Sequence, residues 1–118
     1  DERPDWKVIE DYNPTAYMLL TIDEDNMPVA VSDGDLLGAF VGGECRGLAR
    51  PAKGIDDVMR FYMTICTCEE DEHENVQDMV VVKYYSAAKH RIYESEEFKF
   101  VQGQALGSST ESYSTKWK

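Results

Sequence analysis

The sequence predicts an all-β protein, a single antiparallel β-sandwich of Ig-like or jelly-roll-like type with about nine short strands. Tyr, Val, Phe, Thr and Ile recur in short runs that are separated by turn residues. The chain has 118 residues, 42% of them hydrophobic, which is enough for a core and too apolar for disorder. No internal repeat or domain boundary is visible. We therefore expect one domain over residues 1–118, with flexible ends near 1–5 and 114–118.

Three strands are expected before residue 35. Trp6, Val8 and Ile9 predict a short edge strand. The apolar run Tyr17–Ile22 predicts a strand that is buried on both sides, and Pro28–Val31 predicts a short strand. Turns are expected at Asn13-Pro14, Asp23–Met27 and Ser32–Gly34.

The stretch Asp35–Arg50, DLLGAFVGGECRGLAR, predicts a complete β-hairpin around Gly42-Gly43, a dipeptide that suits the positive φ angles of a type I′ turn. A two-residue turn sets the register. The expected pairs are Val41 with Glu44, Phe40 with Cys45, Ala39 with Arg46, Gly38 with Gly47, and Leu37 with Leu48. Because side chains alternate between the two faces of a strand, we expect the core face of the hairpin to carry Leu36, Phe40, Cys45 and Ala49.

The second half of the chain predicts four or five further strands. Arg60–Thr67 alternates, with Phe61, Met63 and Ile65 on one face, and Met79–Tyr85 is the strongest strand signal in the chain. The remaining expected strands are His90–Tyr93, Glu96–Val101 with Phe98 and Phe100 inward, and an edge at Tyr113–Lys116. The expected connections are a loop at Pro51–Asp57, an acidic loop at Glu69–Asp78, and turns at Ser86–Lys89 and Gly103–Ser109.

The net charge of the chain limits the classes of partner that we expect. The net charge of −11 repels phosphate backbones and anionic lipid, so we expect no nucleic-acid partner. The longest apolar runs are too short to cross a bilayer, so we expect no direct membrane insertion. Three cysteines form an odd number and indicate no redox compartment.

Short acidic turns raise the hypothesis of a Ca²⁺ site, since Ca²⁺ takes several oxygen ligands. The candidate ligands are Asp23, Asp25, Asp33 and Asp35, if their turns converge at one end of the sandwich. The ordinary interpretation is that acidic turns are solvated, and we expect no resident metal or cofactor.

No catalytic set is visible. Cys45 is expected to be a buried apolar side chain, because both histidines, His73 and His90, lie in or beside turns. Arg46 has two interpretations. It either packs on small neighbours and pairs with a carboxylate such as Glu44, or it clamps a ligand carboxylate or sugar.

Aromatic side chains are plentiful, and not all are needed in a core of this size. Exposed tyrosine or tryptophan would form a platform for sugars or peptides. The candidate ligand-binding residues are Trp6, Tyr12, Tyr62, Tyr113 and Arg46.

The string AFVGGECRGLARP, which follows an aspartate and two apolar residues, resembles a domain of secreted and surface proteins of Bacteroidetes. The matching positions are Trp6, Asn13-Pro14 with Tyr17, Asp35, Ala39-Phe40-Val41-Gly42, Glu44-Cys45-Arg46-Gly47, Tyr84-Tyr85, Phe98 and Leu106-Gly107. Gly38 replaces the usual first alanine of the motif. The resemblance implies an extracytoplasmic β-sandwich module, often part of a larger surface protein, and it implies no established activity.

Three functions are compatible with these observations. The first is a non-catalytic binding or spacer module of adhesion type, with a saccharide or a protein at the cell surface as partner. The second is a glycan-binding module that uses surface aromatics. The third is a small glycoside hydrolase, which needs two carboxylates about 5–9.5 Å apart. We expect a non-enzyme, because no catalytic set is visible and a sandwich this small rarely forms the deep cleft that such a carboxylate pair needs.

Overall fold

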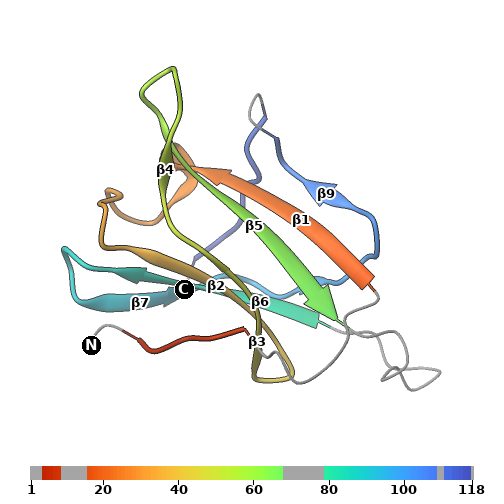
Figure 1. The fold of residues 1–118 in the computed structure, drawn as a ribbon. Coiled ribbons are helices and arrows are strands. Elements are labelled where there is room, and N and C mark those ends of the chain that lie inside the picture. The colour runs from red at the N-terminus through yellow and green to blue at the C-terminus, as the bar shows by residue number, and fades with distance from the viewer. Residues whose placement is uncertain (1–3, 9–15, 68–78, 109–110, 118) are drawn as a thin grey trace.

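The computed structural model describes residues 4–8, 16–67, 79–108 and 111–117, and it confirms the predicted all-β sandwich. Two sheets pack face to face around one core (Figure 1). Sheet A has the order β4-β5-β1-β9, and sheet B has the order β3-β2-β6-β7 with β8 also paired to β6. The strands are β1 (Ala16–Asp23), β2 (Leu36–Val41), β3 (Glu44–Ala49), β4 (Ala52–Lys53), β5 (Met59–Thr67), β6 (Met79–Ser86), β7 (Arg91–Glu94), β8 (Phe98–Lys99) and β9 (Ala105–Leu106).

Several predicted elements differ from the observed ones. Pro28–Val31 is not a strand; a 3₁₀ turn, η1 (Glu24–Asn26), and an irregular connection lead from β1 to β2. The predicted loop at Pro51–Asp57 contains β4. Among the described residues, all strand pairs are antiparallel except β1 with β9, which are parallel. The predicted acidic loop Glu69–Asp78 lies outside the described residues.

Strand β5 confirms the face that its alternation predicts. Phe61, Met63 and Ile65 are buried in the core, whereas Tyr62 points outward. Strand β1 contradicts its prediction of burial on both sides. Its inner residues are buried, but Tyr17 and Leu19 on the outer face are exposed, because within the described residues no second layer packs on that part of sheet A.

The hairpin turn is as predicted, with φ of 59° at Gly42 and 83° at Gly43. The two predicted pairs next to the turn, Val41 with Glu44 and Phe40 with Cys45, are also confirmed. Beyond them the register shifts by one residue, so that Ala39 pairs with Gly47. Arg46 is the extra residue of a β-bulge, which a count outward from the turn does not anticipate.

The predicted core face of β2 is wrong. Leu37, Ala39 and Val41 belong to the core, while Phe40 lies on the outer face of sheet B and is half-buried. Every residue of β2 is apolar or glycine, so alternation could not choose between the two faces. Residues packed on the outer face, described below, shield Phe40 there.

The two sheets approach closely where β3 passes β5. A Cβ atom on Gly47 would lie 2.8 Å from the main-chain oxygen of Thr64 and 3.1 Å from Cγ of Met63. The Cys66 thiol donates a hydrogen bond of 3.5 Å to the carbonyl oxygen of Arg46 at the same corner. Glycine is therefore required at position 47 for this approach.

The segment after β9 closes the opposite edge of the sandwich. Tyr113 N–H donates to the Thr21 carbonyl at 2.9 Å, and Glu96 N–H donates to the Lys116 carbonyl at 3.0 Å. Trp117, expected to belong to a flexible end, packs against the core, and its indole N–H donates to the Asn26 carbonyl at 3.0 Å. The segment thus covers core residues that the short strand β9 leaves open.

Candidate binding face on sheet A

The outer face of sheet A carries large apolar side chains that the fold leaves uncovered. Tyr17 is 48% exposed, Leu19 is 51% exposed and Tyr62 is 51% exposed. We call these three residues, with their neighbours Thr64 and Ala105, the tyrosine face. Its members come from three adjacent strands: β5, β1 and β9.

Strand register explains why these side chains share one face. In the β1–β5 ladder, Leu19 lies opposite Thr64, and Tyr62 lies opposite Thr21. In the parallel β1–β9 ladder, Leu19 lies beside Ala105. Tyr17 and Tyr62 are four residue positions apart along the ladder, which is about 13 Å at the usual strand rise. The result is an elongated apolar strip with a tyrosine near each end.

A fixed ion pair borders the strip beyond Tyr62. The guanidinium of Arg60 donates two hydrogen bonds to the Asp56 carboxylate, of 2.7 and 3.1 Å. The bond from Arg60 is the largest cause that lowers the pKa of Asp56 to about 2, and the same bond raises the pKa of Arg60. The guanidinium is therefore already engaged by a carboxylate, and the strip itself carries no charge.

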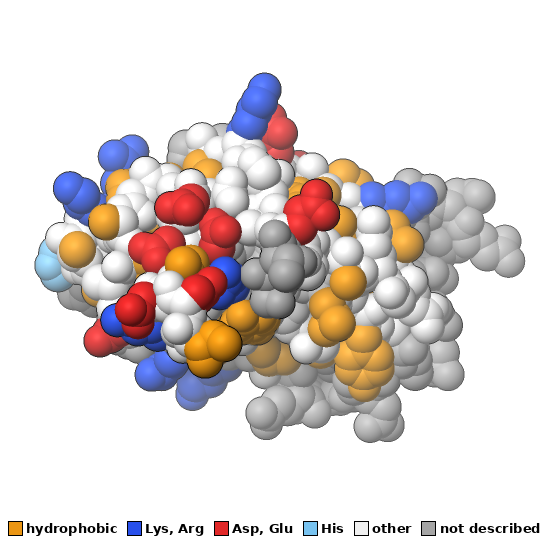
Figure 2. All heavy atoms as spheres, turned by 90° about the horizontal axis from the view of Figure 1, so that it is seen from above, with side chains coloured by type: hydrophobic (Ala, Val, Ile, Leu, Met, Phe, Trp, Pro, Cys, Tyr) orange, Lys and Arg blue, Asp and Glu red, His pale blue; other side chains and the backbone are white. Residues whose placement is uncertain are grey.

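Acidic turns occupy the end of the sandwich beside this ion pair. Figure 2 looks onto this end and shows acidic side chains gathered there. The Glu24 carboxylate accepts a 2.9 Å hydrogen bond from Met59 N–H, which holds η1 against the start of β5. Asp25 and Asp57 are exposed at the same end. Negative charge here discourages anionic ligands next to the strip.

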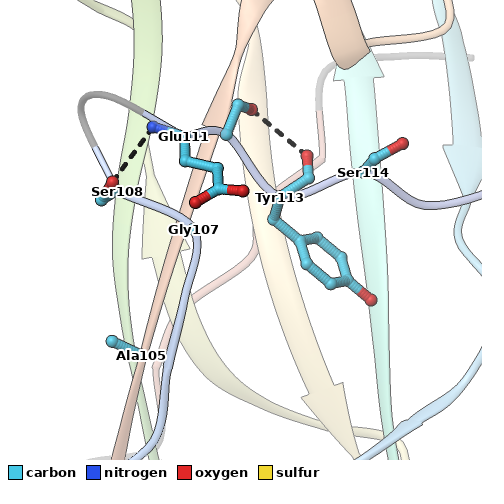
Figure 3. Close-up of a pocket in the computed structure, with 7 residues that line it drawn as sticks. Ala105, Gly107, Ser108, Glu111, Tyr113 and Ser114 are labelled. Atoms are coloured by element: carbon cyan, nitrogen blue, oxygen red, sulfur yellow. Dashed lines mark hydrogen bonds between the residues drawn. The ribbon is translucent and has the colours of Figure 1, made fainter.

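A pocket of about 500 Å³ lies at the β9 edge of sheet A (Figure 3). Its lining is rich in hydroxyl groups and consists of Ala105, Gly107, Ser108, Glu111, Ser112, Tyr113 and Ser114. Ala105 belongs to both the pocket and the tyrosine face. Figure 3 shows the Glu111 carboxylate between the two chain segments that form the walls.

In contrast, Trp6 covers Phe40 and Gly38 on the outer face of sheet B. The Trp6 ring packs edge-on against Phe40, with 5.3 Å between ring centroids, and lies over Gly38, where a Cβ would be 3.0 Å from the indole. The Lys83 ammonium lies 4.9 Å from the centre of the Phe40 ring. Trp6 also lines a second pocket with Lys7, Val8 and Leu48. Trp6 thus covers its sheet rather than standing as an exposed platform.

The other predicted binding residues lie in different parts of the molecule. Arg46, the extra residue of the bulge, is buried with its guanidinium 3.4 Å from the Glu44 carboxylate, which matches the structural interpretation. Tyr113 is half-buried, 5.8 Å from the Phe98 ring, and lines the pocket at the β9 edge. Tyr12 lies outside the described residues. Tyr17, which the structure exposes on the tyrosine face, is not among the predicted binding residues, because the apolar run around it predicts burial on both sides.

The four proposed Ca²⁺ ligands are not brought together. Asp23 accepts hydrogen bonds from its own turn, at Asp25 N–H and the Asn26 amide. Asp33 is exposed. Within the described residues, no group of three or more His, Cys, Asp or Glu side chains is placed to hold a metal ion.

Asp35 has a structural role in this arrangement. Its buried carboxylate accepts hydrogen bonds from the Tyr84 hydroxyl, from the N–H and hydroxyl of Ser32, and from Ala87 N–H at 2.8 Å. Burial, followed by the hydrogen bond to Asp35, raises the pKa of Tyr84. The pair ties the entry of β2 to the end of β6.

Cys45 matches the interpretation as a small apolar side chain. Its thiol is buried and donates a 3.4 Å hydrogen bond to the Gly47 carbonyl. Burial raises the pKa of this thiol, which disfavours the nucleophilic thiolate.

Comparison with protein-family models, with curated proteins and with solved structures found no match for this chain. Among the described residues, no helix is long and apolar enough to cross a membrane.

Proposed function

We propose that this domain is a non-catalytic binding module of a secreted or cell-surface bacterial protein, and that it binds an uncharged saccharide on the tyrosine face. The observation that carries the proposal is the exposure of Tyr17, Leu19 and Tyr62 in one strip. The extracytoplasmic location rests on the resemblance of the hairpin motif to secreted Bacteroidetes domains.

The chemistry of the strip favours a saccharide. A tyrosine ring offers an apolar face for the C–H side of a sugar ring and a hydroxyl for its polar rim. The strip itself carries no charge, and the net charge of −11 disfavours anions. Both properties suit a neutral ligand that is apolar on its faces and polar at its edges.

The size of the strip favours a small ligand over a stable protein partner. Three half-exposed side chains of this kind present roughly 300 Å² in total, since a buried aromatic side chain covers about 150–250 Å². Stable protein interfaces bury about 800 Å² on each partner. An oligosaccharide needs much less area than that.

The test is calorimetric titration with four neutral hexasaccharides, namely cellohexaose, xylohexaose, laminarihexaose and mannohexaose. We expect at least one to bind, and Tyr62→Ala to weaken that binding about tenfold, which is about 1.4 kcal/mol. Ile55→Ala is the matched control, because Ile55 is fully exposed on the β4–β5 loop and lies outside the strip. Binding that Ile55→Ala reduces as much as Tyr62→Ala would count against the proposed face.

The non-catalytic part of the proposal has its own test. We expect no turnover in a screen of glycoside, ester and peptide substrates. Turnover that one Asp or Glu substitution abolishes would overturn it.

A further inference from the structure

The pocket at the β9 edge holds a carboxylate that the fold does not use. Within the described residues, no hydrogen bond or ion pair engages the Glu111 side chain. The main chain of Glu111 is engaged instead, since its N–H donates to the Ser108 hydroxyl at 3.1 Å and its carbonyl accepts from Ser108 N–H at 2.7 Å. Two main-chain bonds therefore set the position of this residue, while its carboxylate faces the pocket (Figure 3).

Polar groups line the pocket beside Glu111. Ser114 also belongs to the lining, but it lies beyond Tyr113 and its hydroxyl is directed away from Glu111 (Figure 3). The Ser112 hydroxyl is used by the fold, since it accepts from Asp23 N–H at 2.8 Å and donates to the Tyr113 carbonyl. The Glu111 carboxylate can therefore face a ligand, and its two oxygens suit the adjacent hydroxyl groups of a sugar ring.

The pocket and the tyrosine face are adjacent. Thr21 lies opposite Tyr62 in the β1–β5 ladder, and its carbonyl accepts the N–H of Tyr113 from the pocket wall. The pocket is therefore two strand spacings from Tyr62 across the sheet, which is about 10 Å.

We infer that the pocket is a second subsite of the same binding site, in which the Glu111 carboxylate hydrogen-bonds the hydroxyl groups of one sugar ring while another ring of the same chain stacks on Tyr62. This inference rests on the proposed saccharide function and adds to it. A carboxylate subsite excludes anionic sugars and requires free hydroxyl groups on the bound ring. It also makes affinity depend on chain length, because a short chain cannot reach both subsites.

The experiment compares Glu111→Gln with Glu97→Gln, a matched control at an exposed glutamate outside the pocket and the tyrosine face. Glutamine keeps the main-chain bonds of position 111 and removes only the charged acceptor. We expect Glu111→Gln to weaken binding of the best of the four hexasaccharides about tenfold, and to leave binding of the matching disaccharide within twofold. The midpoint temperature of thermal unfolding should be the same for both variants and the wild type.

The outcomes separate the two proposals. Wild-type affinity of Glu111→Gln for the hexasaccharide, together with weak binding by Tyr62→Ala, overturns the subsite and leaves the tyrosine face in place. Equal losses of affinity for the hexasaccharide and the disaccharide also overturn it. The effect of Glu111 would then not require a chain long enough to contact both subsites. Failure of the wild type to bind any of the four hexasaccharides overturns both.

Discussion

The outer faces of the two sheets both carry aromatic side chains, but these side chains differ in how far other residues cover them. Sheet B carries Phe40 outward and covers it with Trp6, whereas sheet A carries Tyr17 and Tyr62 outward with about half of each side chain exposed. An aromatic side chain under a second aromatic contributes to stability, and one that faces solvent contributes little. The uncovered face is therefore where we look for binding, and the covered face is where we look for stability.

Asp35→Ala should give the largest effect, on the sheet B side. The variant leaves the Tyr84 hydroxyl and the N–H groups of Ser32 and Ala87 without their acceptor. We expect a loss of about 3–5 kcal/mol in the free energy of unfolding, measured by urea denaturation. Asp33→Ala, at an exposed neighbour, should change it by no more than about 0.5 kcal/mol. Similar losses in both variants would mean that the buried network is not what holds β2 to β6.

Trp6→Ala tests the comparison of the two faces directly. Its removal uncovers Phe40 and Gly38, and we expect a loss of about 2 kcal/mol in unfolding free energy. Tyr62→Ala on the uncovered face should cost less, about 1 kcal/mol, because half of its side chain already faces solvent. If the two variants lose equal stability, the distinction between a covered and an uncovered face is wrong.

The pH dependence of the unfolding free energy should reveal the ionisation of the buried Tyr84. The folded protein raises the pKa of Tyr84 above its ordinary value near 10, so the stability that this group contributes is complete below about pH 10. It is lost as the pH rises further, with a slope of up to about 1.4 kcal/mol per pH unit. Tyr84→Phe should remove this component of the slope, which urea titrations at several pH values above 10 would detect. An unchanged slope in the variant would contradict the assignment.

The sequence predicted the fold class, the Gly42-Gly43 turn and the inward face of β5 correctly, because each depends on local signals. The turn needs positive φ at two glycines, and alternation along β5 selects Phe61, Met63 and Ile65. These signals require no knowledge of distant residues.

Other features depend on contacts between distant segments. The choice of face in β2 follows from Trp6, more than 30 residue positions earlier, and the bulge at Arg46 follows from the close passage of β3 over β5. The tyrosine face was only half predicted. Tyr62 stands in an alternating strand, but Tyr17 stands in an apolar run whose exposure depends on what the rest of the chain leaves uncovered.

The most direct test of the central claim is a solution NMR titration with the best-binding neutral hexasaccharide, following the main-chain amide signals of both sheets. The account predicts that the signals that shift belong to the tyrosine face, at Tyr17, Leu19, Tyr62 and Thr64, and to the adjoining pocket at Glu111. The signals of Trp6 and Leu48 on sheet B should remain in place. Shifts concentrated around Trp6 and Leu48, or no shifts at all, would contradict it.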